Sequence, residues 1–215
     1  MCNITLISTI HKENGKCNAD ELHRIIEEIS PEVIFLEALE SCYTEYSHRL
    51  FATSDVYNKR LEISAIQKYS HKHTFEYIPV LDDVLPDEFE ERAKIVCENY
   101  EYQKLLITLI SMENKYGFQF LNSKKNIELQ EEMRKLEKHI LSNNELWQKV
   151  DGGIDAYENS MIRNIYAYCK DNQFNTAIFM CGAAHRKSII EKIEKYKTQE
   201  NISLNWRFYG NSEAE

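Results

Sequence analysis

The feature that most constrains the fold is the order of apolar segments at the start of the chain. Residues 4–10 form a short, β-branched apolar run, which is typical of a strand buried on both faces of a sheet. Asn18 can cap a helix, with Glu21 three residues later, and a second apolar run follows at residues 33–36. A strand, a helix and a strand within about 35 residues fit the right-handed crossover between two parallel strands. The sequence therefore predicts an α/β fold with a mostly parallel sheet.

The same alternation recurs along most of the chain. A second helix is predicted over residues 56–69 and a third strand over residues 75–81. Residues 176–180 predict a fourth strand, which a helix follows, and residues 202–208 predict the last strand. We expect these segments to form one domain over all 215 residues, an open sheet with helices on both faces.

The pattern changes between about residues 86 and 150. This stretch is long, charged and helix-favouring, with one glycine, Gly117. It predicts two or three helices inserted as a cap or lid. The sequence of residues 151–153, Asp-Gly-Gly, is expected to break this helical run, and a further helix then extends to about Asn172.

Composition limits the classes of partner and compartment. The formal net charge of -9 argues against nucleic acid, because binding to a phosphate backbone depends on clustered lysine and arginine. The six cysteines include no pair at the spacing of a redox or zinc motif, so we expect reduced thiols. The first apolar run is short and lacks a basic flank, which predicts neither a secretory signal nor a membrane span. We expect a cytoplasmic protein that acts on a small molecule or a peptide.

Polar residues follow several predicted strands directly or after a short turn. They are His11, Glu37, Asp82 and His185. The carboxyl ends of parallel strands meet at one edge of a sheet, where ligands bind in open α/β folds, so these residues could meet there. Gly182 permits a tight turn that places His185 near the start of a helix, where the helix dipole favours neutral imidazole. Neutral imidazole can bind a metal or accept a proton, although a single histidine there could equally cap or pack the helix.

These positions resemble the motifs of the TraB, Tiki and erythromycin-esterase-like superfamily. The matching positions are, in chain order, Ser8-Thr9-Ile10-His11, Glu37, Glu62, Arg163-Asn164 and Gly182-Ala183-Ala184-His185. The likeness covers about residues 3–82 and 154–186, and the predicted cap carries no family motif. Ser8 stands where the family has a glycine, so the backbone there can approach a ligand less closely.

The resemblance implies a site centred on His11, Glu37 and His185, with Glu62 and Arg163 in support. Proteins of this superfamily include proposed metal-dependent peptidases, a macrolide esterase with a histidine base, and haem-binding lipoproteins. We therefore predict a hydrolase of an ester or amide bond. Two alternatives remain. One is a protein of the same fold that binds a metal ion or haem without turnover, and the other is a regulatory or interaction protein that works through its helical insertion and whose ancestral site has decayed.

Two mechanisms are compatible with the predicted hydrolase. In the first, His11, Glu37 and His185 bind a divalent metal (Zn, Mn or Co) that supplies a hydroxide near neutral pH. In the second, which needs no metal, Glu37 orients His11 as the base that deprotonates water. The oxyanion is then stabilised by Arg163 or His185.

Arg163 and Glu62 each have a second interpretation. One helical stripe is formed by Ile154, Tyr157, Met161, Ile165 and Tyr168. Arg163 projects from nearly the opposite face of this helix, so one interpretation is a solvated arginine. The other is that the stripe packs on the inserted helices, or that Arg163 lines the crevice at the sheet edge. Glu62 is typical of a surface helix residue, and only the family pattern makes it a site residue.

Overall fold

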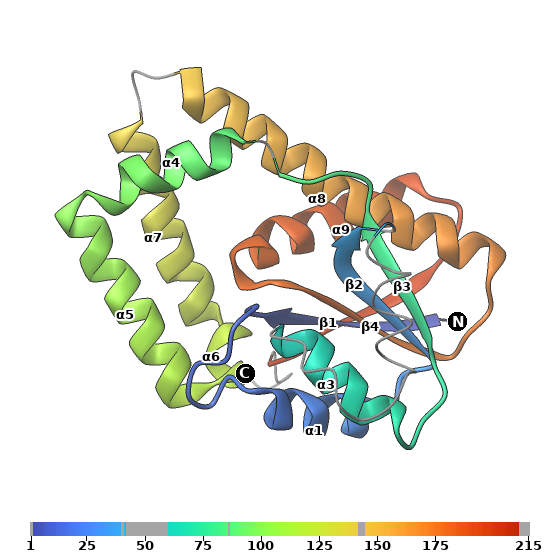
Figure 1. Ribbon diagram of the computed structural model, residues 1–215. Helices are drawn as coiled ribbons and strands as arrows, with labels where there is room; N and C mark the ends of the chain where they lie inside the picture. The colour runs from blue at the N-terminus through green and yellow to red at the C-terminus, as the bar shows by residue number, and fades with distance from the viewer. Residues whose placement is uncertain (1, 40, 42–59, 86, 142–144, 211–215) are drawn as a thin grey trace.

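The computed structural model has a five-stranded sheet in which all strand pairs are parallel, in the order β3-β2-β4-β1-β5 (Figure 1). The strands are β1 (Cys2–Thr9), β2 (Val33–Leu39), β3 (Glu76–Leu81), β4 (Thr176–Gly182) and β5 (Leu204–Phe208). The residues that the structure describes are 2–39, 41, 60–85, 87–141 and 145–210. The predicted α/β class with a parallel sheet is confirmed.

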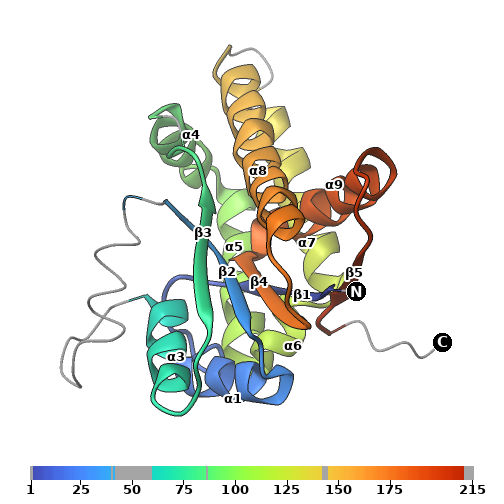
Figure 2. The ribbon, with the colours of Figure 1, turned by 90° about the vertical axis from the view of Figure 1, so that its right-hand side faces the viewer.

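Helices cover both faces of the sheet (Figures 1 and 2). Successive strand residues point to opposite faces, so in β2 Ile34 packs with α1 and α3, while Phe35 packs with α8 and α9. Both side chains are fully buried, which explains why this strand reads as a continuous apolar run. The bounds of the covering helices are α1 (Ala19–Ile29), α3 (Leu61–Ser70), α8 (Glu145–Asp171) and α9 (Arg186–Gln199).

A helical cap stands beside the sheet, as predicted, but it contains more helices than the two or three expected (Figure 1). It consists of α4 (Glu88–Cys97), α5 (Tyr100–Tyr116), α6 (Phe118–Leu121), α7 (Lys124–Ile140) and the first turns of α8. The cap has its own buried core, to which α5 contributes Leu109, α7 contributes Met133 and α8 contributes Val150. Because α8 runs from this core to the sheet, one helix joins the cap to the rest of the fold.

The predicted break at residues 151–153 is wrong, because α8 continues through both glycines. Glycine lowers helix propensity by only about 1 kcal/mol, which tertiary packing can outweigh. Val150 is buried in the cap core and Ile154 packs against it, so the helix is held on both sides of the glycines. Gly152 itself is exposed.

Some element boundaries also differ from the prediction. β2 continues to Leu39, so Glu37 lies within the strand, and the register with β3 shifts between Leu36 and Leu39. The predicted helix over residues 56–69 corresponds to α3, which begins at Leu61, and residues 56–59 lie outside the described part of the chain. The last strand begins at Leu204 rather than residue 202, because Ile202 belongs to the preceding bend.

Two further expectations concern thiols and membranes. The cysteines in the described ranges, at positions 2, 17, 97, 169 and 181, are all free, and Cys42 lies outside those ranges. Among the same residues, no helix combines the length and apolar character that crossing a lipid bilayer requires.

Candidate functional site

A pocket of about 430 Å³ lies between the carboxyl edge of the sheet and the cap. Its sheet side is lined by His11, Glu37 and His185, so the structure brings the three central predicted residues to one cavity. Its cap side is mainly apolar and includes Phe89 and Trp147. An apolar cavity with a few convergent polar groups is the usual form of a small-molecule site.

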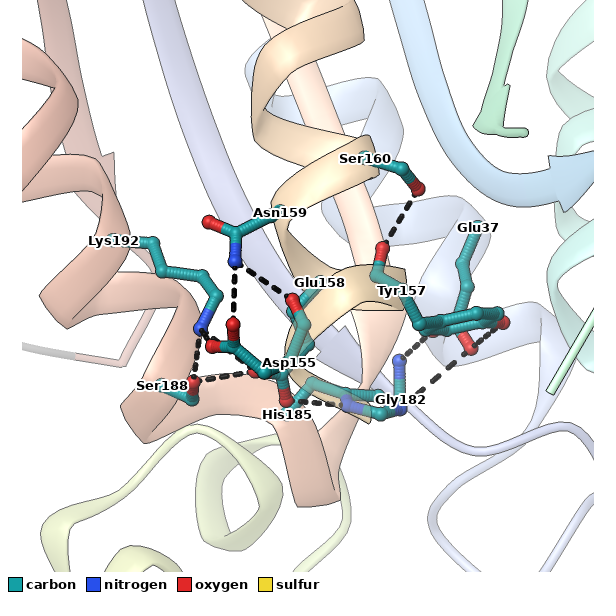
Figure 3. A network of polar contacts seen from close by, with 10 residues as sticks. All are labelled: Glu37, Asp155, Tyr157, Glu158, Asn159, Ser160, Gly182, His185, Ser188 and Lys192. Atoms are coloured by element: carbon teal, nitrogen blue, oxygen red, sulfur yellow. Dashed lines mark hydrogen bonds and ion pairs between the residues drawn. The ribbon is translucent and has the colours of Figure 1, made fainter. Parts of the chain in front are cut away.

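His185 is held by a buried carboxylate. It ends the short 3₁₀ turn η1 (Ala183–His185) between β4 and α9, and its Nδ1 lies 2.8 Å from Oε1 of Glu158 on α8 (Figure 3). The side chains of His185 and Glu158 are only 12% and 2% exposed. A carboxylate at this position accepts a hydrogen bond from Nδ1–H, which leaves Nε2 as the nitrogen that can exchange a proton.

Glu158 is itself supported by a hydroxyl and an ammonium group. Ser188 donates a hydrogen bond to its Oε2, and Lys192 Nζ lies 3.3 Å from the same atom (Figure 3). Burial alone would raise the pKa of Glu158, but the hydrogen bonds from His185 and Ser188 and the nearby positive charges lower it below the ordinary value. Glu158 therefore remains an anion beside the imidazole.

Glu37 lies next to His185 but is bonded to other groups. The Gly182 amide donates to Oε2 at 2.6 Å, and the Tyr157 hydroxyl donates to Oε1 at 2.8 Å (Figure 3). Burial, together with Glu37, raises the pKa of Tyr157, so the tyrosine keeps its proton as a donor. Nε2 of His185 lies 3.8 Å from Glu37 Oε1, which is too long for a direct hydrogen bond.

His11 forms a second histidine–glutamate pair. Its Nδ1 lies 3.1 Å from Oε1 of Glu62, which also accepts a 2.8 Å hydrogen bond from Thr9 Oγ1. Glu62 is 4% exposed, whereas the His11 side chain is 48% exposed. The hydrogen bond to Glu62 raises the pKa of His11 above 6.5; burial opposes this shift, and the charges of Glu62 and Glu37 add to it. Glu62, rather than Glu37, therefore orients His11.

Arg163 lies outside the pocket. Its guanidinium pairs with Asp82, and both side chains are about half exposed. Asn164 donates to the Asp82 carboxylate at 2.7 Å and to the Val80 carbonyl at 3.2 Å. The Arg–Asn pair thus ties α8 to the end of β3, and the structure does not bring Arg163 or Asp82 to the histidines.

Gly182 lies beside His185 and Glu37 and has an ordinary backbone conformation. Its φ of -55° is one that any residue adopts, so the turn before His185 does not require the conformational freedom of glycine, contrary to the prediction. A Cβ atom there would lie 3.4 Å from Cδ2 of His185 and 3.5 Å from Oε2 of Glu37. These are ordinary van der Waals distances, so a Cβ atom would fill the space beside the two side chains without a clash.

The donor groups do not fit the predicted metal site well. In the described part of the chain, no group of three or more His, Cys, Asp or Glu side chains could hold a metal ion. Both oxygens of Glu37 already accept hydrogen bonds from Tyr157 and Gly182. Metal binding by His11, Glu37 and His185 therefore stays a prediction.

Two residues of the site, Glu158 and Tyr157, were not identified from the sequence. Glu158 stands at helical spacing between Ile154 and Met161, beside the apolar stripe. A carboxylate at the edge of a buried helix face requires a hydrogen-bonding partner. This requirement is the sequence signal that could have identified Glu158 as a buried, paired residue. The identity of the partner depends on how α8 packs on the sheet.

Comparisons with known proteins give one distant structural match. No protein-family model matches the chain, and no curated protein matches it. Among solved structures, a mutant of the erythromycin esterase EreC in its open conformation matches with a TM-score of 0.40 and 11% identity. The alignment covers 83% of this chain and 60% of the esterase chain, so this chain spans less than two thirds of that protein. Nothing about activity follows from so distant a match, and the TraB and Tiki resemblance is not supported by these comparisons.

Proposed function

We propose that this protein is a hydrolase that cleaves an ester or amide bond in the pocket between the sheet and the cap. The observation that carries the proposal is the pair of histidines, each held at Nδ1 by a buried glutamate, in the wall of one pocket. A carboxylate on Nδ1 orients an imidazole and leaves Nε2 for proton transfer. Two such pairs supply a base and an acid for one reaction.

In this proposal, His185 is the general base. Its neutral Nε2 takes a proton from water as the water oxygen attacks the substrate carbonyl carbon and the carbonyl electron pair moves to oxygen. Glu158 then stabilises the imidazolium that forms. In this proposal the attacking water lies between Nε2 and Glu37 Oε1, which are 3.8 Å apart, and donates one hydrogen to each.

His11 is the acid in the same proposal. Its raised pKa favours the imidazolium, whose N–H can stabilise the oxyanion and then protonate the leaving oxygen or nitrogen. Collapse of the tetrahedral intermediate breaks the carbon–heteroatom bond, and exchange with solvent returns a proton to His11 and removes one from His185. The half-exposed position of His11 suits this exchange. These roles differ from the sequence-based mechanism, in which Glu37 orients His11 as the base.

A panel of nitrophenyl esters and nitroanilides tests the proposal. We expect turnover by the natural sequence and a loss of at least about 100-fold in His185→Gln, the scale of a general-base contribution. His139→Gln, which changes an exposed histidine of α7, is the control and should keep full activity. If the natural protein hydrolyses none of the compounds faster than His185→Gln does, the proposal fails.

The predicted metal dependence is tested by repeating the assay with a chelator and with added zinc, manganese or cobalt.

A further inference from the structure

The wall of the pocket carries basic side chains that the proposed chemistry does not use. Arg92 on α4, Arg134 on α7 and Lys187 at the start of α9 all line the cavity. Lys187 is paired with Glu131 at 2.6 Å, so its charge is compensated. The two arginines require a separate explanation in a chain with a net charge of -9.

Arg92 has hydrogen-bonding capacity to spare. Its NH2 lies 3.4 Å from Oε1 of Glu137, an atom that already accepts a 2.8 Å hydrogen bond from the Tyr102 hydroxyl. A contact of 3.4 Å is long for a charge-assisted hydrogen bond. The guanidinium also lies over the Phe89 ring at 4.2 Å, and its Nε has no hydrogen-bond partner. The side chain of Arg92 is 14% exposed. Its neighbours orient it, but they use only part of its hydrogen-bonding capacity.

Arg134 is a half-buried cation on the same wall. It lies three residues before Glu137 on α7, so the two side chains share a face of that helix, and both line the pocket. Within the described ranges it makes no hydrogen bond or ion pair. A half-buried guanidinium without an ion pair has lost part of its hydration, and a bound anion would provide the missing partner.

We propose that Arg92 and Arg134 bind a carboxylate of the substrate. The substrate of the proposed hydrolase would then be a small amphipathic ester or amide, with an apolar body and a carboxylate at the cap end. Guanidinium groups match carboxylates in geometry as well as charge. The neighbouring Met133 and Trp147 exclude water, which strengthens such a contact, and a volume of about 430 Å³ suits a small molecule rather than a long peptide. That the bound carboxylate belongs to a substrate rests on the proposed function, but the anion site itself can be tested without turnover.

Calorimetric titration with octanoate and with neutral octanamide tests the anion site directly. We expect the natural protein to bind octanoate at least about tenfold more tightly, as a charge-assisted contact requires. Arg134→Gln should lose this preference. Lys135→Gln is the matched control, because it removes the same charge from an exposed position of the same helix outside the pocket. A preference that survives in Arg134→Gln, or that is lost only in His11→Gln, would place the carboxylate elsewhere and overturn the inference.

Arg92 needs a paired substitution. Arg92→Gln alone would leave Glu137 buried without its cation, so we use the double variant Arg92→Gln/Glu137→Gln, which removes both charges. It should also lose the octanoate preference.

Hydrolysis of two nitrophenyl esters connects the anion site to the reaction. The esters of hexanoic and adipic acid differ in a terminal carboxylate, and we expect kcat/KM to favour the adipate ester by about tenfold, with the preference lost in Arg134→Gln. Equal kcat/KM values would overturn the inference about the substrate. If neither ester is cleaved but octanoate binding depends on Arg134, the proposed function fails while the carboxylate site stands.

Discussion

The Glu158 carboxylate determines which nitrogen of His185 carries a proton. Glu158→Gln keeps the size of the side chain but removes the charge that stabilises the imidazolium, and Lys192 keeps its second partner, Asp155, at 2.6 Å. We expect kcat for the best ester to fall by about 100-fold or more, with little change in the far-ultraviolet circular dichroism spectrum. Glu194→Gln, at an exposed position of α9, serves as the control. Unchanged kcat in Glu158→Gln would exclude His185 as the base.

The His11–Glu62 pair makes a pH-dependent contribution to stability. Because the folded-state pKa of His11 is raised above 6.5, this contribution is fully present below pH 6.5 and is lost as the pH rises through the folded pKa. Glu62→Gln removes the main cause of the shift. The free-energy difference between the natural protein and Glu62→Gln, measured by urea unfolding, should therefore be larger at about pH 6 than at about pH 9. NMR titration should show the His11 midpoint moving down in Glu62→Gln, and an unmoved midpoint would contradict the role of Glu62.

At the residue scale, the sequence predicts which strand-end residues line the pocket better than it predicts the carboxylates that hydrogen-bond to the histidines. His11, Glu37 and His185 follow from the rule that parallel strands end at one edge, and all three line the pocket. Glu62 has a local pattern typical of a surface helix, yet it is buried where α3 begins and is hydrogen-bonded to Thr9 at the end of β1 and to His11. Glu158 comes from α8, whose contact with the sheet edge depends on tertiary packing that no short spacing encodes.

At the element scale, the strands were predictable because both of their faces are buried. The central run of β2, residues 33–36, is apolar at each position, and helices cover both sides. α8 was not predicted as one helix, because two adjacent glycines are usual in turns. Packing on either side of the glycines, by Val150 and Ile154, overrides their local preference.

The uninterrupted α8 leads to a prediction about Gly152. A Cβ atom at this position would meet no atom within 4 Å, and the residue is exposed inside a helix. Gly152→Ala should therefore raise the free energy of unfolding by about 0.5–1 kcal/mol, because alanine loses less backbone entropy on folding. Urea unfolding monitored by circular dichroism measures the change. A decrease in stability would mean that the helix is interrupted here, as the sequence alone suggested.

At the scale of the whole molecule, one buried arginine joins the sheet to the cap. Arg186, the first residue of α9, donates hydrogen bonds to Ser8 Oγ on β1 at 3.1 Å, to Asn122 Oδ1 after α6 at 2.8 Å, and to the Tyr209 carbonyl at 2.7 Å. Burial lowers the pKa of Arg186 to about 10, so the group stays charged at neutral pH although all three acceptors are neutral. Because His185 directly precedes Arg186, this network also fixes the turn that carries the proposed base.

Asn122 is the residue through which the cap enters this network, and its removal tests the connection. Asn122 Oδ1 accepts hydrogen bonds from the Ser8 amide at 2.7 Å and from Arg186, and all three residues are fully buried. Asn122→Ala leaves both donors without this acceptor, so we expect the free energy of unfolding to fall by about 2–4 kcal/mol. The exposed Asn172→Ala is the control, and its stability should change by less than about 0.5 kcal/mol.

Hydrogen exchange shows where Asn122→Ala loosens the structure. Amide exchange should become faster in α6 and α5 while β4 stays protected, because the cap loses its buried contact with β1 and β4 keeps its pairing with the neighbouring strands. Equal quickening in β4 would show that Asn122 supports the whole fold rather than the junction between sheet and cap.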